Sequence, residues 1–241
     1  MSAAPRFYCP QPLAAGPLVL PAQTTRHVQV RRLQPGDPLT LFNGTGGTWH
    51  GQLTHMTRTQ ATVALTTPVV SECASRYRVH LAIGMPANER MDWVMEKATE
   101  LGAASLTPLL TARSVSKPSG ERAERRQLHW HGVVAAACAQ SGRNHLPIVH
   151  PIVDLTTWLH HLPAPQDDPM PRFVLHTGQA RGLPVDHAPQ PLLLLCGPEG
   201  GLTADELQGA QAQGFQPASL GPLTLRSDTA AIAAVARCTL I

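Results

Sequence analysis

This chain of 241 residues has very little lysine and no closely spaced pair of cysteines. Lysine occurs only at positions 97 and 117, so arginine carries almost all of the positive charge. The five cysteines are odd in number and form no CxxC pair, which argues against a disulfide framework or a zinc knuckle and favours a reducing cytosol. Because the chain also lacks a signal-peptide pattern and an apolar stretch long enough to span a bilayer, we expect a soluble, cytoplasmic protein.

Two common site patterns are missing as well. The sequence contains no GxxxxGKS or GxxxxGKT motif, which excludes a phosphate-binding P-loop of that type. Its twelve histidines never show HExxH spacing, and the densest groups, at 129–131 and 160–161, have no carboxylates nearby in a ligand pattern. We therefore expect no metal site.

The positive charge is concentrated in the first third of the chain. Residues 1–80 hold seven arginines against two acidic residues, a net charge of +5, which leaves −2 for residues 81–241 of the whole-chain value of +3. A preference for arginine over lysine does not explain the scarcity of acidic residues there. We interpret the first third as a domain that contacts the phosphates of a nucleic acid.

Two glycine-containing loops near the C-terminal end are the clearest functional signal. The first, residues 196–201 (CGPEGG), follows the apolar run Leu192–Cys196, which is typical of a strand buried on both faces. The second covers residues 220–230 (LGPLTLRSDTA). Glycine tolerates positive φ and lets a ligand approach the backbone closely, so both loops are candidates for ligand binding.

A helix is expected after each loop. Thr203 to Glu206 form a capping box, and Ser227 or Asp228 is expected to cap an alanine-rich helix from about Thr229. Two strand-loop-helix units side by side create a crevice at the carboxyl ends of parallel strands. Open α/β sheets bind their ligands in such a crevice.

The rest of the chain shows two patterns. Residues 17–68 alternate β-favouring segments with turn signals, and the clearest strands, at 39–42, 49–53 and 62–65, predict a small β-barrel. Further along, expected strands alternate with expected helices, which predicts a parallel, doubly wound sheet. The strands are expected at 77–83, 106–110, 148–153 and 173–176, and the helices at 89–101, with Asn88 as its cap, at 120–139 and at 154–162.

Several segments resemble one known family in the same order along the chain. They are Arg6-Phe7-Tyr8, residues 27–44, Glu96 to Gly102 (EKATELG), Gln140 to Asn144 (QSGRN) and the two glycine loops. Together they are similar to the RsmE family of the SPOUT class. Members of that family use S-adenosylmethionine to methylate N3 of a uridine in small-subunit ribosomal RNA.

The resemblance implies a fold and partners. It implies a PUA-like β-barrel that binds RNA at residues 1–75 and an α/β SPOUT methyltransferase domain at 76–241. A deep trefoil knot is implied within residues 173–241, although physical reasoning alone predicts an unknotted chain. It further implies S-adenosylmethionine as co-substrate without a metal, small-subunit ribosomal RNA or the small ribosomal subunit as partner, and a homodimer.

The resemblance also suggests site residues. Arg226 is expected to stabilise negative charge on the uracil as N3 loses its proton, and Glu199 or Asp228 to accept that proton. A phosphate anchor and an ion pair with Glu199 are the alternatives for Arg226. The expected cofactor-binding residues are His176, Gly197, Glu199, Gly200, Gly201, Leu220, Gly221, Leu225, Arg226 and Thr229, and the expected RNA-binding residues are Arg6, Arg26, Arg31, Arg32 and Arg143.

Some positions depart from the family pattern. Leu223 stands where the family usually has a basic residue, Asp228 where it has Glu, and Ala87-Asn88 where it tends to have Lys-Gly. Two other functions therefore stay open. One is a different SPOUT activity, on a ribose 2′-hydroxyl or on tRNA, and the other is a non-catalytic RNA-binding factor in ribosome assembly.

Overall fold

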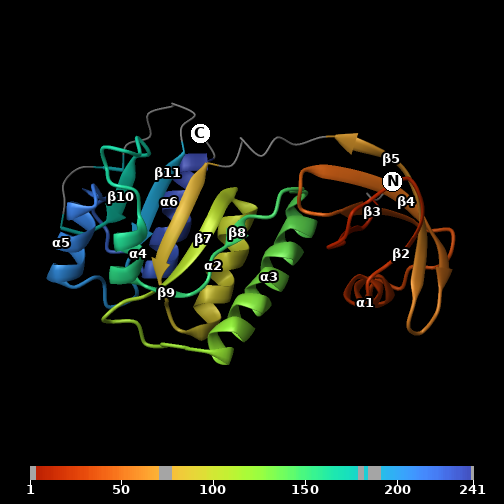
Figure 1. Cartoon of the computed structure of the whole chain (residues 1–241), viewed down its shortest axis with the longest axis horizontal. Helices are drawn as coiled ribbons and strands as arrows, with labels where there is room; N and C mark the ends of the chain where they lie inside the picture. Colours follow the sequence, from red (N-terminus) through yellow and green to blue (C-terminus); the bar gives the residue numbers. More distant parts are fainter. Residues whose placement is uncertain (1–3, 71–77, 179–181, 184–190, 240–241) are drawn as a thin grey trace. The chain divides into compact units, whose positions relative to one another are not determined.

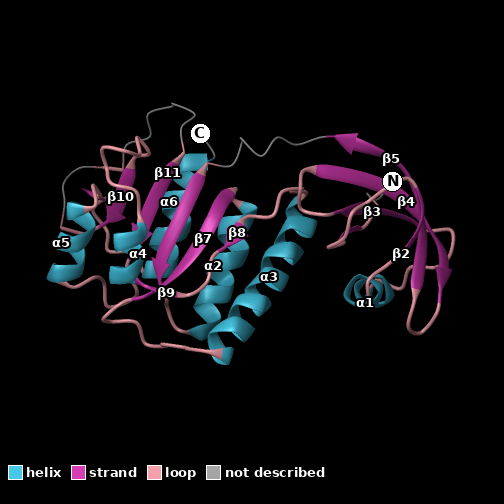
Figure 2. Cartoon of the chain, viewed as in Figure 1, coloured by secondary structure: helices cyan, strands magenta, loops and turns pink. Residues whose placement is uncertain are grey.

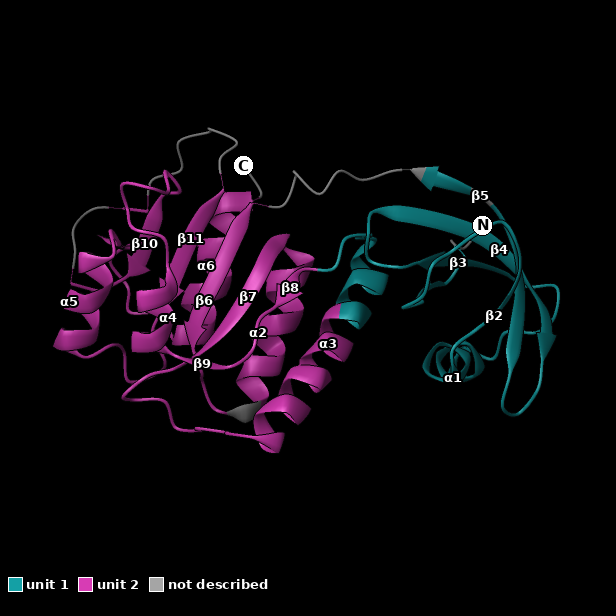
Figure 3. Cartoon of the chain, viewed as in Figure 1, with its two compact units in different colours: residues 1–76, 135–146 teal, residues 77–134, 147–241 magenta. Residues whose placement is uncertain are grey.

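The chain divides into two compact units in the computed structural model (Figure 3). The structure describes residues 4–70, 78–178, 182–183 and 191–239. The first unit consists of residues 1–76 and 135–146, and the second of residues 77–134 and 147–241. The boundary predicted between residues 75 and 76 falls outside the described residues.

The first unit is built on one five-stranded sheet (Figure 1). Its elements are β1 (Arg6–Tyr8), β2 (Gly16–Val19), α1 (Ala22–Val30), β3 (Pro38–Phe42), β4 (Gly47–Met56) and β5 (Ala61–Val70). The strand order is β1-β3-β4-β5-β2; β1 and β3 run parallel, and the other neighbours run antiparallel. Leu41, Leu53, Val63 and Val28 belong to its buried core, which joins the sheet to α1.

Turn chemistry explains the hairpin between β3 and β4. Gly44 and Gly46 have φ values of 86 and 107, which side-chain-bearing residues rarely adopt. Asn43 Oδ1 accepts a hydrogen bond from the Thr45 N–H at 3.2 Å and closes the turn locally. The three strands predicted at 39–42, 49–53 and 62–65 are confirmed and are longer than expected.

Helix α1 lies in a region where the sequence predicted β-favouring segments. Its buried residues are Thr24, Thr25 and Val28, two β-branched threonines and a β-branched valine. Such residues favour strands in isolation, so burial of this face against the sheet overrides their local preference.

The second unit contains a parallel sheet (Figure 2). Its strands are β6 (Val79–Gly84), β7 (Ala103–Leu110), β8 (Ile148–Val149), β9 (Val153–Asp154), β10 (Arg172–Leu175), β11 (Leu192–Cys196) and β12 (Gln216–Ala218). The order is β12-β10-β11-β6-β7-β8, with β9 also paired to β7, and each of these pairs is parallel. The segment predicted as one strand at 148–153 forms two short strands, because Pro151 cannot donate to a ladder.

Helices cover both faces of this sheet, as predicted for a doubly wound α/β fold. They are α2 (Asn88–Glu100), α3 (Glu121–Ser141), α4 (Leu155–His161), α5 (Ala204–Ala212) and α6 (Ser227–Thr239). Successive residues of β11 serve opposite faces: Leu193 and Leu195 join the core under α4 and α5, whereas the Cys196 thiol contacts the Ser227 carbonyl in α6. No helix in the described part of the chain is long and apolar enough to cross a membrane.

The N-termini of α5 and α2 test two predictions about helix capping. The capping box of α5 is confirmed, since Thr203 Oγ1 accepts from the Glu206 N–H at 3.2 Å and Glu206 Oε2 accepts from the Thr203 N–H at 2.8 Å. The prediction that Asn88 caps α2 was wrong, because α2 already begins at Asn88 and Ala87 is its N-cap without a side-chain hydrogen bond.

Helix α6 also begins earlier than predicted, at Ser227. The Arg226 carbonyl accepts the Ala230 N–H at 2.8 Å, the first hydrogen bond of the helix. Arg226 therefore occupies the capping position that was predicted for Ser227 or Asp228. The knot stays a prediction, and residues 179–181, 184–190 and 240–241 of its interval lie outside the described residues.

Candidate active site

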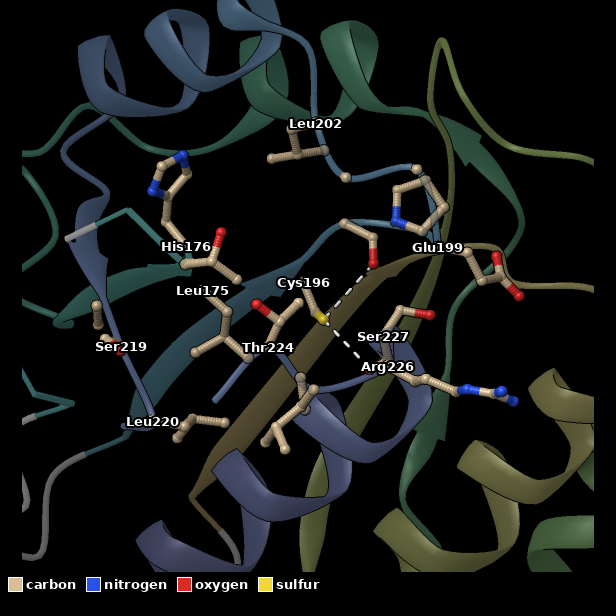
Figure 4. Close-up of a pocket in the computed structure, with 18 of the residues that line it drawn as sticks. Leu175, His176, Cys196, Glu199, Leu202, Ser219, Leu220, Thr224, Arg226 and Ser227 are labelled. Atoms are coloured by element: carbon tan, nitrogen blue, oxygen red, sulfur yellow. Dashed lines mark hydrogen bonds between the residues drawn. The ribbon is translucent and has the colours of Figure 1, made fainter. Parts of the chain in front are cut away.

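A pocket of about 770 Å³ lies at the carboxyl ends of β10, β11 and β12, three neighbouring strands (Figure 4). The loop after each strand lines it. The lining residues lie at the end of each strand and just after it: Leu175 and His176 for β10, residues 196–202 for β11, and residues 218–221 and 223–227 for β12. The crevice predicted from the two glycine loops is therefore present.

Gly197 shows why the first loop needs glycine. A Cβ at this position would lie 3.0 Å from the Leu202 amide nitrogen and 3.1 Å from the Gly201 carbonyl carbon, because the loop folds back on itself. The Gly201 N–H donates to the Pro198 carbonyl at 2.8 Å, and Gly201 has a φ of +69. A side chain at Gly197 would crowd this tight turn along the pocket, and one at Gly201 would strain the backbone because of its positive φ.

Two contacts that the sequence analysis missed tie the segment after β7 to the first loop and to α5, the helix that follows it. Arg113, from the segment after β7, donates through Nη1 to the Gly200 carbonyl at 2.7 Å, and it lines the pocket. Glu206 Oε1 accepts the Ala112 N–H at 2.7 Å. Because the β7 segment is far from the loop in sequence, no local motif indicates this relation.

The Glu199 carboxylate faces the start of α2. Its Oε1 accepts the backbone N–H of Ala87, the N-cap of that helix, at 3.1 Å. Exposed N–H groups at a helix N-terminus favour a negative charge. Among the described residues no ion pair joins Glu199 to Arg226, so the ion-pair alternative for Arg226 has no support.

The second glycine loop is closed by its own serine. Ser219 Oγ accepts from the Gly221 N–H at 3.2 Å and donates to the Gly221 carbonyl at 3.0 Å, and Gly221 has a φ of +135. Leu223, in the same loop, lines the pocket and is 77% exposed. The chain thus presents an apolar side chain where the family resemblance leads one to expect a basic residue.

Arg226 and Asp228, two of the predicted catalytic residues, lie in different surroundings. Arg226 is exposed and lines the pocket. Asp228 is buried, is not among the lining residues, and accepts from Arg90 Nη1 at 2.8 Å. Arg90, in the first turn of α2, does line the pocket, so the structure adds an arginine that the sequence analysis missed.

Cys196 lines the pocket as a buried thiol. Burial, reinforced by the charge of Asp228, raises the pKa of Cys196 to about 12. Its Sγ contacts the carbonyls of Gly197 and Ser227 at 3.6 and 3.5 Å. The thiol therefore stays protonated and is a packing group, since only a thiolate is a strong nucleophile.

The predicted cofactor-binding residues gather at this pocket. All of them except Thr229 line it. Thr229 instead donates its N–H to Asp228 Oδ1 at 2.9 Å in the first turn of α6. Within the described ranges, no group of three or more His, Cys, Asp and Glu residues is placed to hold a metal ion.

The predicted RNA-binding arginines belong to the first unit and form two sets. Arg26, Arg31 and Arg32 are exposed on α1 and the turn after it. Arg6 and Arg143 are packed together instead: Arg6 Nη2 donates to Asn144 Oδ1 at 2.6 Å and to the Arg143 carbonyl at 3.3 Å. Arg143 is only 5% exposed, so the first set is the accessible one.

Comparison with known proteins supports this description of the two units. Residues 73–239 match the model of an RNA methyltransferase domain, and residues 20–66 match that of an RNA methyltransferase PUA domain. A ribosomal RNA small subunit methyltransferase E of Synechocystis sp. is 34% identical over 211 residues, which cover 87% of this chain and 68% of the relative.

Two solved structures that contain S-adenosylmethionine are also similar. The ribosomal RNA small subunit methyltransferase E of Neisseria gonorrhoeae has a TM-score of 0.88 and 32% identity, over 97% of this chain and 96% of the other. A protein of Legionella pneumophila, described as a methyltransferase, has a TM-score of 0.89 and 31% identity over the same shares of the two chains.

The parallel α/β sheet, the pocket at its carboxyl edge and the matching domain models define an RNA methyltransferase. More closely, the chain belongs to the ribosomal RNA small subunit methyltransferase E family. This membership confirms the resemblance found in the sequence.

Proposed function

We propose that this protein transfers a methyl group from S-adenosylmethionine to N3 of a specific uridine in small-subunit ribosomal RNA. The observation that carries the proposal is the pocket lined by both glycine loops and Arg226, in a chain whose relatives are named for small-subunit ribosomal RNA methylation and are solved with this cofactor. The protein is thus an S-adenosylmethionine-dependent ribosomal RNA methyltransferase.

The pocket fits the cofactor. Its volume of about 770 Å³ is in the range of small-molecule sites, and its walls combine apolar side chains with backbone polar groups. We assign the adenosyl group to the backbone of residues 197–201 and 220–225, where glycines permit close approach. When bound there, S-adenosylmethionine supplies an electrophilic methyl group.

Arg226 is the residue to which we assign stabilisation of the reacting base. Uracil N3 carries an imide proton, and the ring becomes negative as that proton leaves. Arg226 directly precedes α6 and lines the pocket, so its guanidinium lies within reach of this charge and can stabilise it. Holding N3 in line with the methyl group supplies much of the remaining rate enhancement.

The two carboxylates take different roles in this proposal. Glu199 lines the pocket and is the candidate to accept the N3 proton. Asp228 forms an ion pair with Arg90, so we propose that it acts by positioning that arginine beside the pocket. A carboxylate is a weak base for an imide, so anion stabilisation contributes more than the base.

The first unit is proposed to bind the RNA around the target. Arg26, Arg31 and Arg32 offer three exposed guanidinium groups to flanking phosphates. The target base must be unpaired or flipped to enter the pocket.

We also propose that the protein is a homodimer and acts in the cytoplasm. Its mass measured in solution tests the homodimer directly.

The proposal is tested by incubating the protein with labelled S-adenosylmethionine and small ribosomal subunits that lack native modification. Nuclease digestion and mass analysis then locate the product. Methyl at uracil N3 supports the proposal. Methyl on a ribose 2′-oxygen, or transfer to tRNA alone, indicates a different RNA methyltransferase, and cofactor binding without any transfer indicates a non-catalytic RNA-binding factor.

A further inference from the structure

Ser227 carries a buried hydroxyl group whose hydrogen-bonding capacity is unused. The residue is 8% exposed, and its Oγ has no hydrogen-bond partner among the described residues. An unsatisfied buried hydroxyl is costly to a folded protein and is rare in native structures. The position therefore calls for an explanation, and a ligand is one that the surroundings support.

Ser227 belongs both to the pocket wall and to the helix that carries it. Ser227 is the first residue of α6 and lines the pocket. Figure 4 shows the Ser227 side chain and the longer Arg226 side chain extending toward the same side of the view, where Glu199 also lies. The helix does not use this hydroxyl as a cap, since the Arg226 carbonyl starts the hydrogen-bond ladder.

Positive charge surrounds this part of the pocket. Arg226 precedes Ser227 directly, and Arg90 lines the same pocket while its Nη1 is held by Asp228 at 2.8 Å. The backbone N–H groups at the start of α6 add partial positive charge. The Glu199 carboxylate also lines the pocket, but its Oε1 accepts the Ala87 N–H at 3.1 Å. The two arginines and the helix N–H groups are donors, so a group that enters between them is held best by acceptor oxygens.

We propose that Ser227 is a substrate-binding residue whose Oγ donates a hydrogen bond to a carbonyl oxygen of the target base. This inference rests on the proposed function. Uracil has a carbonyl oxygen on each side of N3, so a donor to one of them anchors the base while N3 faces the methyl group. The neighbouring guanidinium of Arg226 remains available for the charge that develops on the ring.

The chemistry of the pocket favours uracil over cytosine for the same reason. Cytosine carries an amino group beside N3 in place of one carbonyl oxygen. The arginine side chain can only donate hydrogen bonds. An amino group facing Arg226 or Arg90 would therefore place one donor against another, and no hydrogen bond would form. A site that is built to hydrogen-bond one chemical group strongly rejects an analogue without that group, because the buried polar groups of the site are then left unpaired.

A substrate role makes an unusual prediction for Ser227→Ala. Removing a hydroxyl that lacks a partner in the folded protein is expected to leave the thermal unfolding midpoint unchanged or to raise it. The same change is expected to lower kcat/KM for unmethylated small subunits about tenfold, the value of one hydrogen bond. The dissociation constant of S-adenosylmethionine, measured by calorimetry, stays within about twofold.

Two further variants sharpen the test. Ser227→Thr retains the hydroxyl and is expected to recover most of the activity. Ser105→Ala is a matched control, because Ser105 is also buried but its Oγ is hydrogen-bonded to His80 Nδ1 at 2.8 Å. That control is expected to lower the unfolding midpoint and to leave kcat/KM unchanged.

The proposal is overturned if Ser227→Ala transfers methyl at the wild-type rate, if its activity falls only together with its stability, or if the loss lies in cofactor affinity. The wild-type product is analysed in the same experiment. A wild-type product at a site other than uracil N3 overturns the proposed function, while the ratio of Ser227→Ala to wild type on that RNA still decides whether Ser227 binds the substrate.

Discussion

Arg90 Nη1 donates to Asp228 Oδ2 at 2.8 Å and joins the first turn of α2 to the first turn of α6. The two residues are 138 positions apart in sequence. Their side chains differ in exposure, at 37% for Arg90 and 12% for Asp228. The pair fixes a guanidinium beside the pocket and leaves its carboxylate out of the pocket lining.

Breaking this pair from either side is expected to have unequal effects. Arg90→Gln leaves the more buried carboxylate without its cation and is expected to lower the free energy of unfolding by about 2 kcal/mol. Asp228→Asn leaves an arginine that water can reach and is expected to lower it by about 1 kcal/mol. Urea unfolding measures both values. An equal effect, or a larger one for Asp228→Asn, would contradict this account of the pair.

Gly84, at the end of β6, is predicted to be intolerant of a side chain. A Cβ there would lie 2.5 Å from Pro198 Cδ and 2.8 Å from the Pro198 nitrogen, so Gly84→Ala must displace the first glycine loop. We expect about a tenfold weaker affinity for S-adenosylmethionine, measured by calorimetry.

Gly132→Ala provides the matched control. Gly132 lies inside α3, and a Cβ there meets nothing within 4 Å. Alanine favours a helix interior over glycine by about 1 kcal/mol, so this variant is expected to gain stability and to bind the cofactor normally. Wild-type cofactor affinity in Gly84→Ala would show that the loop does not depend on this contact.

His80 is expected to make stability sensitive to acid. Burial, followed by the charge of His150, lowers the pKa of His80, and its Nδ1 lies 2.8 Å from Ser105 Oγ. The unfolded chain therefore takes up a proton near its ordinary pKa of about 6.5, while the folded chain resists it. Stability is fully present above that pH and falls as the pH drops from there toward the lowered folded pKa.

The measurement compares urea unfolding at about pH 7.5 and about pH 5.5 for the wild type and His80→Gln. Glutamine keeps a polar group that can bond Ser105 but does not titrate. The variant is expected to lose less stability between the two pH values. An identical loss in both proteins would assign the acid sensitivity to other groups, among them His150, whose pKa burial also lowers.

The exposed arginines of the first unit are expected to control the salt dependence of RNA binding. Each phosphate contact contributes about 0.7 to 0.9 to the slope of log affinity against log salt. Replacing Arg26, Arg31 and Arg32 by glutamine is expected to lower that slope by about 2 to 3 in filter-binding titrations. Arg125→Gln is the control, because Arg125 is paired with Glu121 at 2.7 Å on α3. An equal change in both proteins would contradict the assignment of RNA binding to α1 and the turn after it.

Local sequence signals predicted the parts of the structure that depend on local chemistry. The apolar run Leu192–Cys196, the Thr203 to Glu206 capping box and the alternating strands and helices each determine structure within a few residues. The glycine loops marked the pocket because a close turn such as that of Gly197 excludes side chains. These features also located the carboxyl edge of the sheet.

Relations that depend on distant segments were missed. Arg90 meets Asp228, and Arg113 meets Gly200, only after the parallel sheet has brought different loops to one edge. The sequence predicted Ser227 as a helix cap. The structure shows instead that the Arg226 carbonyl accepts the first helical hydrogen bond and that the Ser227 hydroxyl is buried without a hydrogen-bond partner among the described residues. Helix α1 was missed because tertiary packing overrides the strand preference of its threonines and valines.

Single-turnover methyl transfer by Arg226→Ala tests the central claim most directly. Wild type and variant, each saturated with S-adenosylmethionine, are mixed with unmethylated small subunits, and methyl at uracil N3 is followed over time. The account predicts about a hundredfold slower transfer, with cofactor affinity within about threefold of wild type. Transfer by Arg226→Ala at the wild-type rate would contradict it, because the base would then be methylated without the charge that this pocket supplies.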